Sequence, residues 1–413
     1  MNSGPQAKLQ CCIAGGGPAG MMLGLLLARA GVRVTVLEKH ADFLRDFRGD
    51  TIHPSTLEVM HELGLLAGLL DLPHQKARSL SAQVGDRLMP VADFGHLPTR
   101  CRFIAFMPQW DFLTYLAEQG RRYPGFTLLM QAEASELIEA HGHVVGLRAK
   151  TAERPLEMHA DLVIAADGRH STLRRQAGLA VKDLGAPMDV LWFRLSRQAD
   201  DPDQPLARFE AGRIFILINR GDYWQCGFVI PKASYETIRS AGLQRFRDLV
   251  DKLSPFAAAR AAELRDWNDV SLLTVRVDRL RQWHRPGLLC IGDAAHAMSP
   301  IGGVGINLAI QDAVAAANLL AAPLRDGRLT QAHLHAVQRR RMLPTRVTQG
   351  LQLALQKRVV GRVLAGGERL SPPLALRLLA QVPFLRRLPA RLIGLGVRPE
   401  HVTAPLILQA ESD

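Results

Sequence analysis

The chain has 413 residues, enough for two or three packed units, with 47% hydrophobic and 22% charged residues. This composition is ordinary for a globular protein and excludes a fibrous or wholly disordered chain. Five cysteines, an odd number, do not predict a disulfide framework, so we expect a reduced, cytoplasmic protein. The formal net charge is +12, but residues 325–413 hold 14 Arg and one Lys against five acids. The basic excess is therefore local and does not indicate a nucleic-acid-binding protein.

The first forty residues predict a β-α-β unit that binds a dinucleotide. Its parts are an apolar strand at 9–14, the turn GGGPAG at 15–20, a helix at 21–30 and a second strand at 32–37. Gly15 permits the turn, Gly17 lets the backbone approach a pyrophosphate, and Gly20 lets the helix pack closely on the strand. Glu38, directly after the second strand, can accept hydrogen bonds from ribose hydroxyls and disfavours a 2′-phosphate. The unit therefore predicts FAD or NAD rather than NADP.

The middle of the chain predicts a second, β-rich unit. Helices are expected at 55–63 and 109–122, alternating strands at 127–164, and three apolar strands between 190 and 231 with the sequences VLWFRL, RIFILIN and YWQCGFVI. Helical patterns dominate after residue 302, and prolines divide the tail into short helices.

Two further motifs lie far from the glycine turn. ADLVIAADGRHSTLRR at 160–175 is a buried strand that ends in Asp167 and Gly168. GLLCIGDAAHAMSPIGGVGINLAIQDAVAAANLL at 287–320 is a strand, a Gly-Asp pair, a loop and a glycine-rich entry into a helix. In order and approximate spacing, the three motifs resemble the signatures of the class A flavoprotein monooxygenases, the para-hydroxybenzoate hydroxylase family, over most of the first 345 residues.

The resemblance implies an α/β protein with a Rossmann-like FAD-binding domain, an inserted β-sheet substrate domain and a helical C-terminal tail. The corresponding ranges are 1–72, 101–180 and 280–345 for the FAD-binding domain, 73–100 and 181–279 for the substrate domain, and 346–413 for the basic helical region. It also implies an enzyme in which NADPH or NADH reduces FAD, O2 forms a C4a-hydroperoxyflavin, and an aromatic, lipophilic or polycyclic substrate is hydroxylated. The sequence contains no second glycine fingerprint, which fits a nicotinamide cofactor that visits transiently.

The flavin itself carries this chemistry, so no protein nucleophile is required, and the sequence does not identify which group deprotonates a phenolic substrate. It places Pro300 beside the flavin C4a edge, Arg48 near the pyrophosphate, Gln109 near the adenosine, and Asp167 with Gly168 at both cofactors. The full implied FAD-binding set is Gly15, Gly17, Pro18, Ala19, Gly20, Glu38, Lys39, Arg48, Gln109, Ala134, Asp167, Gly168, Asp293, Pro300, Gly302, Gly303, Gly305, Ile306 and Asn307.

Elementary chemistry supports part of this set. Asp293 can accept hydrogen bonds from a ribityl chain, and Gly302, Gly303 and Gly305 bring bare backbone to the start of a helix. The N–H groups and dipole there favour negative charge on the N1–C2 region of a flavin. Asn307 can close the turn.

Candidate substrate contacts lie on the β-rich strands: Trp192, Arg194, Phe215 and Phe228. Because side chains alternate along a strand, about half of the aromatic residues should face a pocket and half the opposite side. An apolar wall with few charges suits a planar or lipophilic substrate.

Histidines and cysteines are expected to be structural. His296 is more simply a hydrogen-bonding residue than a general base, and His53 and His61 are expected to be surface residues or helix caps. We expect no metal site, because no cluster has metal-ligand spacing. The cysteines are expected to be small buried hydrophobic residues, without a covalent bond to flavin.

Three other functions share this fold. A flavin-dependent reductase or dehydrogenase acting on a polyprenyl or conjugated compound would keep every FAD motif. A halogenase would need two tryptophans before Ile-Pro, where this chain has QCGFVIP at 225–231. A non-catalytic binding protein would not need Asp293 or the GGVGIN loop.

The basic tail has three interpretations. A solvated helical face is the simplest. The segment VPFLRRLPARLIGLGVRP at 382–399 combines Leu and Phe with Arg, as an interfacial helix does, so peripheral contact with the inner face of a membrane is the second. Nucleic acid is the weakest, because aromatic residues suited to stacking are nearly absent from the tail.

Overall fold

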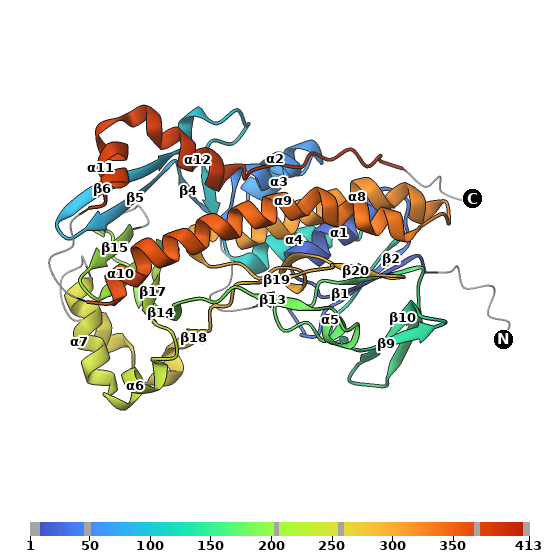
Figure 1. Cartoon of the computed structure of the whole chain (residues 1–413), viewed down its shortest axis with the longest axis horizontal. Helices are drawn as coiled ribbons and strands as arrows, with labels where there is room; N and C mark the ends of the chain where they lie inside the picture. Colours follow the sequence, from blue (N-terminus) through green and yellow to red (C-terminus); the bar gives the residue numbers. More distant parts are fainter. Residues whose placement is uncertain (1–8, 45–50, 202–205, 255–259, 367–371, 408–413) are drawn as a thin grey trace.

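The computed structural model describes residues 9–44, 51–201, 206–254, 260–366 and 372–407. Within them, a six-stranded sheet has the order β20-β21-β12-β1-β2-β8 and is parallel except at β20 (Figure 1). Its strands are β1 (Cys11–Ala14), β2 (Val34–Leu37), β8 (Phe126–Leu129), β12 (Leu162–Ala165), β20 (His284–Arg285) and β21 (Leu288–Cys290). The central strands β1, β12 and β21 are short, apolar and buried on both faces, as a parallel sheet covered on both sides requires.

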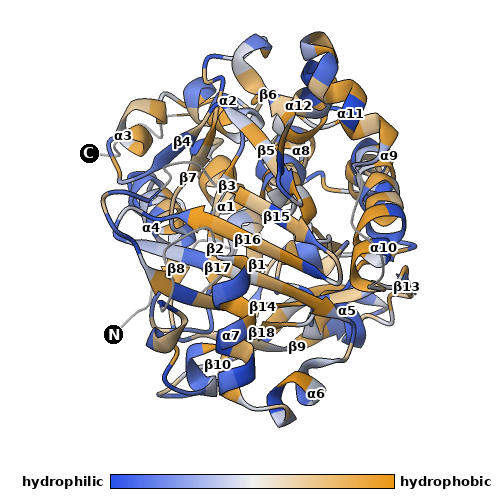
Figure 2. Ribbon diagram, turned by 90° about the vertical axis from the view of Figure 1, so that its left-hand side faces the viewer, coloured by the Kyte–Doolittle hydropathy of each residue, from blue (hydrophilic) through white to orange (hydrophobic). Residues whose placement is uncertain are grey.

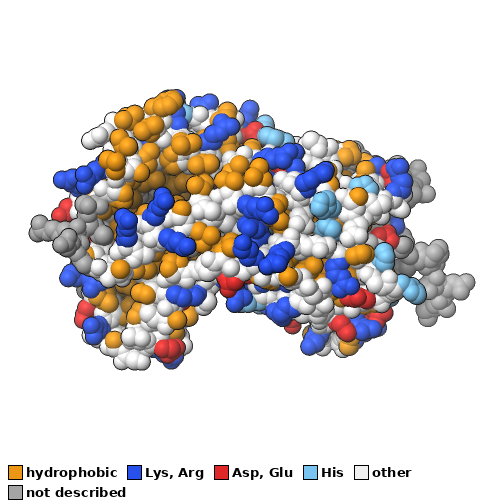
Figure 3. Space-filling view, in the orientation of Figure 1, with side chains coloured by type: hydrophobic (Ala, Val, Ile, Leu, Met, Phe, Trp, Pro, Cys, Tyr) orange, Lys and Arg blue, Asp and Glu red, His pale blue; other side chains and the backbone are white. Residues whose placement is uncertain are grey.

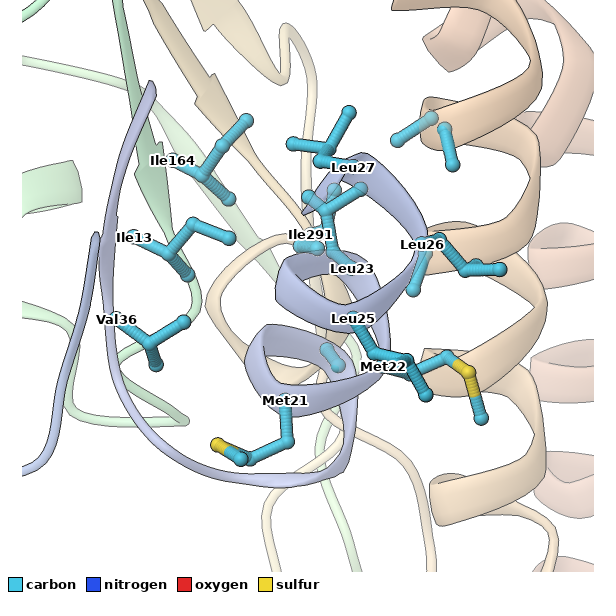
Figure 4. Close-up of a cluster of buried hydrophobic side chains, with 14 of the residues drawn as sticks. Ile13, Met21, Met22, Leu23, Leu25, Leu26, Leu27, Val36, Ile164 and Ile291 are labelled. Atoms are coloured by element: carbon cyan, nitrogen blue, oxygen red, sulfur yellow. The ribbon is translucent and has the colours of Figure 1, made fainter. Parts of the chain in front are cut away.

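Helices α1 (Pro18–Arg29) and α8 (Gly305–Arg325) pack together beside this sheet. Leu and Met side chains surround α1, and Figure 4 shows them between the strand residues Ile13, Val36 and Ile164 on one side and α8 on the other. The segment 301–325, which includes α8, is long and apolar enough to cross a bilayer, but 72% of its most apolar window is buried inside the protein. A core helix has the same properties.

The second large sheet has seven strands in the described part of the chain, in the order β18-β14-β17-β16-β15-β5-β6. They are β5 (Ser79–Val84), β6 (Arg87–Asp93), β14 (Met188–Ser196), β15 (Leu206–Glu210), β16 (Arg213–Asn219), β17 (Tyr223–Pro231) and β18 (Ser271–Leu273). All neighbours are antiparallel except β15 and β5. The sequence assigns these segments to the second domain, and Figure 2 shows that β16 is hydrophobic along most of its length.

The C-terminal region is helical, as predicted. It comprises α9 (Gln331–Leu355), a π-helical turn η6 (Gln356–Val360), α10 (Gly361–Leu364), α11 (Leu374–Gln381), the 3-10 turn η7 (Pro383–Arg386) and α12 (Arg387–Gly394). The domain boundary expected between residues 345 and 346 falls inside α9, which continues across it.

The remaining elements complete the scaffold. Proline suits the first position of a helix, so α1 begins at Pro18 rather than at residue 21. Of the remaining elements, sequence analysis predicts α2 and α4 to within a few residues and strands over the region of β9, β10 and β11, but it does not predict most of the others. The remaining elements are β3 (Thr51–Ile52), α2 (Pro54–Glu62), α3 (Leu66–Leu70), β4 (Gln75–Ala77), η1 (Phe94–His96), β7 (Ile104–Phe106), α4 (Gln109–Gly120), β9 (Glu133–Ala140), β10 (His143–Lys150), β11 (Leu156–His159), α5 (Thr172–Gln176), β13 (Val181–Asp183), α6 (Tyr235–Ser240), α7 (Leu243–Leu253), β19 (Asp278–Leu280), η4 (Gly292–Ala294) and η5 (Ile301–Gly303).

Candidate functional site

The motifs predicted from the sequence meet at one edge of the six-stranded sheet. Strands β1, β2, β12 and β21 are parallel neighbours, so their carboxyl ends lie together. Gly15, Glu38, Asp167 and Asp293 follow these four strands in turn. In open α/β sheets, the carboxyl ends of the strands are where ligands bind.

The glycine turn fits closely between strands. Gly15 has φ +110°, and a Cβ there would lie 2.3 Å from the carbonyl oxygen of Ala166. A Cβ on Gly20 would lie 1.9 Å from the carbonyl oxygen of Gly15, so only glycine lets α1 approach the turn. Gly17 faces open space instead, with nothing within 4 Å of a Cβ, and it precedes Pro18 at the start of α1. The helix start has no side-chain cap, which leaves its N–H groups for an anion.

Glu38 is buried at the end of β2. One carboxylate oxygen accepts a hydrogen bond from the N–H of Gly16 at 3.1 Å, and the other accepts from the N–H of His40 at 3.0 Å. These bonds hold the carboxylate against the glycine turn, where a ribose would reach it. Lys39, the next residue, is exposed.

Two residues of the predicted FAD-binding set, Ala134 and Gln109, flank this region. The N–H of Ala132 donates a hydrogen bond to the carbonyl oxygen of Glu38, so the chain passes the end of β2 directly before β9 begins. Ala134, the second residue of β9, is partly buried. Gln109 is the first residue of α4, which packs on α1. Arg48, the predicted pyrophosphate contact, lies outside the described residues.

Asp167 uses one half of its carboxylate and leaves the other without a protein partner. Its Oδ2 accepts hydrogen bonds from the N–H groups of Thr172 and Leu173 at 2.8 and 3.2 Å, which fixes the start of α5. Its Oδ1 is buried and has no partner among the described residues. Gly168 beside it has φ +80° and open space at its Cβ position. A buried acceptor next to open space is a suitable contact for a donor on a ligand.

Asp293 differs from Asp167 in its exposure. Its side chain is 34% exposed, and a guanidinium nitrogen of Arg169 lies 3.7 Å from its carboxylate. The preceding Gly292 has φ +59°, and a Cβ there would lie 3.1 Å from the Cβ of Ala19. The Gly-Asp pair is thereby placed at the start of α1.

The glycine-rich loop before α8 is held by β3. Gly302 and Gly303 have φ +79° and +63°, and a Cβ on Gly303 would lie 2.4 Å from the hydroxyl of Thr51. That hydroxyl donates to the carbonyl oxygen of Gly303 at 3.0 Å. The side-chain amide of Asn307 donates to the carbonyl oxygens of Thr51 and Gly303, so Asn307 closes the turn as predicted.

The side chain of Asn307 is used within the protein, whereas the start of α8 is left without a side-chain cap. The Asn307 side-chain oxygen accepts from the N–H of His53 and the hydroxyl of Thr56, so its amide is committed to the protein. Pro300 precedes η5, and α8 begins at Gly305 and Ile306 without a side-chain cap. The positive N-terminal end of the 21-residue helix α8 therefore lies at this loop.

Taken together, these residues fit FAD. The open space at Gly17 and Gly168 accommodates phosphates and sugar, and the free Oδ1 of Asp167 offers an acceptor. Glu38 and Asp293 supply carboxylates at the two ends of the edge, and the loop 300–307 supplies backbone N–H groups.

His296 is structural, as predicted. Its Nε2 lies 2.6 Å from Oδ2 of Asp312 in α8, and both side chains are buried. The N–H of Gly292 donates to the same oxygen, and Nε of Arg341 donates to Oδ1 at 3.0 Å. Burial raises the pKa of Asp312, but the charges and hydrogen bonds of His296 and Arg341 lower it by more, so the net shift of the pKa is downward. Arg341 also donates to the buried Glu400 at 3.1 Å, which extends this network to the tail.

His53 differs from expectation. It precedes α2 but is fully buried, and its Nδ1 lies 2.7 Å from the carbonyl oxygen of Ile393 in α12. Burial lowers its pKa to about 4, which keeps the ring neutral. It is thus a buried link between α2 and the tail rather than a surface residue.

The cysteines are buried and unpaired thiols in the described residues. Burial raises the pKa of Cys12 to about 12, and it raises the pKa of Cys11 and Cys290 well above the ordinary value. Thiols with such pKa values are poor nucleophiles.

The seven-stranded sheet has two different faces. We call the one that packs with Ile301 of the glycine-rich loop the loop-side face. Its apolar residues are Met188, Val190, Trp192, Ile214 and Val229, with Phe209, Ile216 and Ile218 partly buried. We call the other the α7-side face; there Phe193, Phe215 and Phe228 pack with Phe246 of α7.

The candidate substrate contacts divide between these faces. Trp192 lies on the loop side with its ring across Gly227, where a Cβ would be 2.9 Å from the indole. Alternation puts Arg194 on the same side, and its guanidinium is 4.8 Å from the centroid of the Tyr223 ring. Phe215 and Phe228 are in the core under α7, so the expectation that they contact substrate is wrong.

Sequence reasoning missed two partly buried residues on the loop side. Ile216 and Ile218 alternate with Phe215 and Leu217 on β16 and face the glycine-rich loop side of the sheet. Trp192 and Ile216 both pair with Gly227 of β17, so they lie on the same face of the sheet. This relation could have identified Ile216 and Ile218, once the strand pairing was known.

Comparisons with known proteins agree with this geometry. Residues 8–350 match the family described as FAD binding domain. The chain is 34% identical over 412 residues to 6-methylpretetramide 4-monooxygenase of Streptomyces rimosus, covering 98% of this chain and 96% of that protein. Among solved structures, p-nitrophenol 4-monooxygenase PnpA of Pseudomonas putida DLL-E4 has a TM-score of 0.76 at 18% identity, covering 93% of this chain and 96% of that one. A PqsL variant of P. aeruginosa has a TM-score of 0.74 at 21% identity, covering 87% and 99%.

Proposed function

Because this chain belongs to the FAD-binding-domain family and is an FAD-dependent aromatic hydroxylase, we propose that its substrate is a polycyclic phenol. The observation that carries the proposal is the loop-side face of the seven-stranded sheet. Most of its apolar residues are buried, in part by Val360 and Val363 of the C-terminal helical region. Phe209, Ile216 and Ile218 are only partly buried, and they pack in the same cluster as Ile301 of the glycine-rich loop. An apolar surface of this kind favours a large planar ring system over a sugar or a phosphate ester.

A relative supports the same substrate class. 6-Methylpretetramide 4-monooxygenase matches nearly the whole of this chain, and its name specifies a polycyclic substrate. That likeness extends through the second domain, where the loop-side face lies, and not only through the FAD-binding motifs.

Bound FAD supplies the redox chemistry, since it is reduced by NAD(P)H and delivers one atom of O2 to the ring. The protein supplies position and electrostatics. Thr51 and Asn307 fix the glycine-rich loop, and the first turn of α8 directs N–H groups and a positive dipole end toward negative charge at the loop. The loop-side face excludes water from the reacting ring.

The test combines oxygen labelling with a substrate series. Purified holoenzyme is given NADPH or NADH, ¹⁸O2 and a series of phenols with one to four fused rings, and products are analysed by mass spectrometry. We expect one ¹⁸O atom in the product and the largest kcat/KM with the fused-ring compounds. NAD(P)H consumption that leaves a reduced, unlabelled product would favour the reductase alternative, and a preference for single-ring phenols would contradict the proposed substrate.

Two variants of Ile216 test whether the loop-side face determines the preference for fused-ring phenols. Ile216→Trp fills the loop-side face and should abolish turnover of fused-ring phenols, whereas Ile216→Val preserves its shape and should retain it. Flavin absorbance and melting temperature of both variants confirm that the FAD site and fold are intact.

A further inference from the structure

The C-terminal helices expose an unusual concentration of large apolar side chains. Leu374, Phe384 and Leu388 are 73%, 66% and 64% exposed. We call the set on α11, η7 and α12 the C-terminal apolar face; it comprises Leu374, Leu378, Val382, Phe384, Leu385 and Leu388. Figure 3 shows hydrophobic side chains gathered over this part of the molecule with basic side chains among them. Soluble proteins rarely leave such a contiguous patch without a partner.

The helices that carry this face are fixed to the body of the protein. α11 and α12 pack on β6, and Ala390 and Leu395 are buried with Phe94 and Leu97 of the η1 region. A Cβ on Gly394 would lie 2.8 Å from the Leu97 side chain, so α12 is closely seated. α12 therefore buries Ala390 and Gly394 on one side, whereas α11 contacts β6 without a buried residue of its own.

The turn between α11 and α12 is fixed as well. Nε of Arg386 donates to the carbonyl oxygen of Leu379 at 2.8 Å, and its Nη2 donates to that of Ala380 at 2.7 Å. These bonds fix η7, the turn that carries Phe384 and Leu385. The exposed side chains are thus displayed by an ordered structure.

The charge of this region has one sign. From residue 372 to 399 the sequence contains five Arg and no Asp or Glu. Arg377, Arg387 and Arg391 are exposed, and the Arg387 guanidinium lies 5.0 Å from the centroid of the Phe384 ring. Exposed Phe and Leu interleaved with Arg on short helices is the pattern of a segment that lies in a membrane interface.

We propose that the C-terminal apolar face binds the surface of membranes that contain anionic phospholipids. Phe384 and Leu388 insert at the boundary of headgroups and acyl chains, and the arginines contact lipid phosphates. A second copy of the chain is a poorer occupant, because it would bring an equally basic face against this one. The proposal concerns binding only and is independent of the substrate proposed above.

The test is flotation of the full-length holoenzyme with vesicles of phosphatidylcholine alone or with about one third phosphatidylglycerol. We expect flotation with the anionic vesicles, little with the neutral ones, and loss of binding at high salt because counterions screen the arginines. The variant Phe384→Ser/Leu388→Ser should reduce binding about tenfold or more, since two apolar anchors are removed. Arg387→Gln/Arg391→Gln should reduce binding to anionic vesicles specifically.

Leu272→Ser is the matched control, because Leu272 is an exposed leucine on β18 outside the face. It should float as the unaltered chain does. Melting temperature and flavin absorbance verify that each variant is folded. No flotation of the unaltered chain, or equal flotation of Phe384→Ser/Leu388→Ser, would overturn the proposal. A dimer that this variant dissolves, or an acidic protein that binds the face while vesicles do not, would overturn it too.

Discussion

The two faces of the seven-stranded sheet are built from the same strands but have different roles. On the α7-side face, the rings of Phe193 and Phe246 are 5.6 Å apart and those of Phe228 and Phe246 are 5.5 Å apart, both edge to face. On the loop-side face, aliphatic residues such as Ile216 remain partly uncovered beside the glycine-rich loop. Alternate residues of one strand therefore divide between holding the fold and meeting a ligand.

The largest expected effect is on the α7-side face. Phe215→Ala should lower the free energy of unfolding by about 3–5 kcal/mol, because the side chain is fully buried and its loss leaves a cavity. Denaturant unfolding measures the loss. The kcat/KM of the molecules that remain folded should be unchanged, and a large change in substrate preference would contradict the division between the faces.

The same face should respond to acid through Asp201. Burial raises the pKa of Asp201, but hydrogen bonds from Arg260, the Gln198 backbone and Trp224 bring it down to about 2. A carboxyl whose pKa is lowered on folding stabilises the protein above its unfolded pKa of 3.8 and loses this contribution as the pH falls through 2. The contribution is about 2 kcal/mol at neutral pH.

Asp201→Asn should therefore lower the free energy of unfolding at pH 7 by about 2 kcal/mol relative to the unaltered chain. The difference between the two proteins should shrink between pH 4 and pH 2. Unfolding curves at a series of pH values check this, and a difference that stays constant across that window would show that the carboxylate charge is not responsible.

The smallest effect on stability is expected on the loop-side face. Ile216→Ala should cost less than about 1 kcal/mol of stability, since the residue is partly exposed, but should reduce kcat/KM for fused-ring phenols about tenfold relative to single-ring phenols. Phe215→Leu, one position away on the opposite face, is the control. It should reduce stability without altering that ratio, and a shift in the ratio for both variants would mean that the faces are coupled.

Local rules of the backbone explain what the sequence predicted well. Gly15 and Gly20 have no alternative in a turn this tight, and Glu38, Asp167 and Asp293 follow apolar strands that are easily recognised. Parallel pairing then brings these residues to one edge without further information.

The orientation of β16 could not be predicted in the same way. Every residue from 214 to 218 is apolar, so the period of two that distinguishes the faces of a strand is hidden. The pattern therefore does not distinguish Phe215 from Ile216 as the residue that faces the glycine-rich loop. The burial of His53 was missed for a related reason, because its partner Ile393 is 340 positions away along the chain.

The link from Gly292 through Asp312 and Arg341 to Glu400 also has a consequence for biosynthesis. The Gly-Asp turn beside the cofactor edge is braced by Glu400, which lies 108 positions after Gly292 in the sequence. During synthesis this brace is missing until Glu400 has emerged from the ribosome, even though every glycine motif has emerged earlier. Tight retention of flavin is thus expected only in chains that include Glu400, and a chain truncated before this residue should hold flavin less tightly.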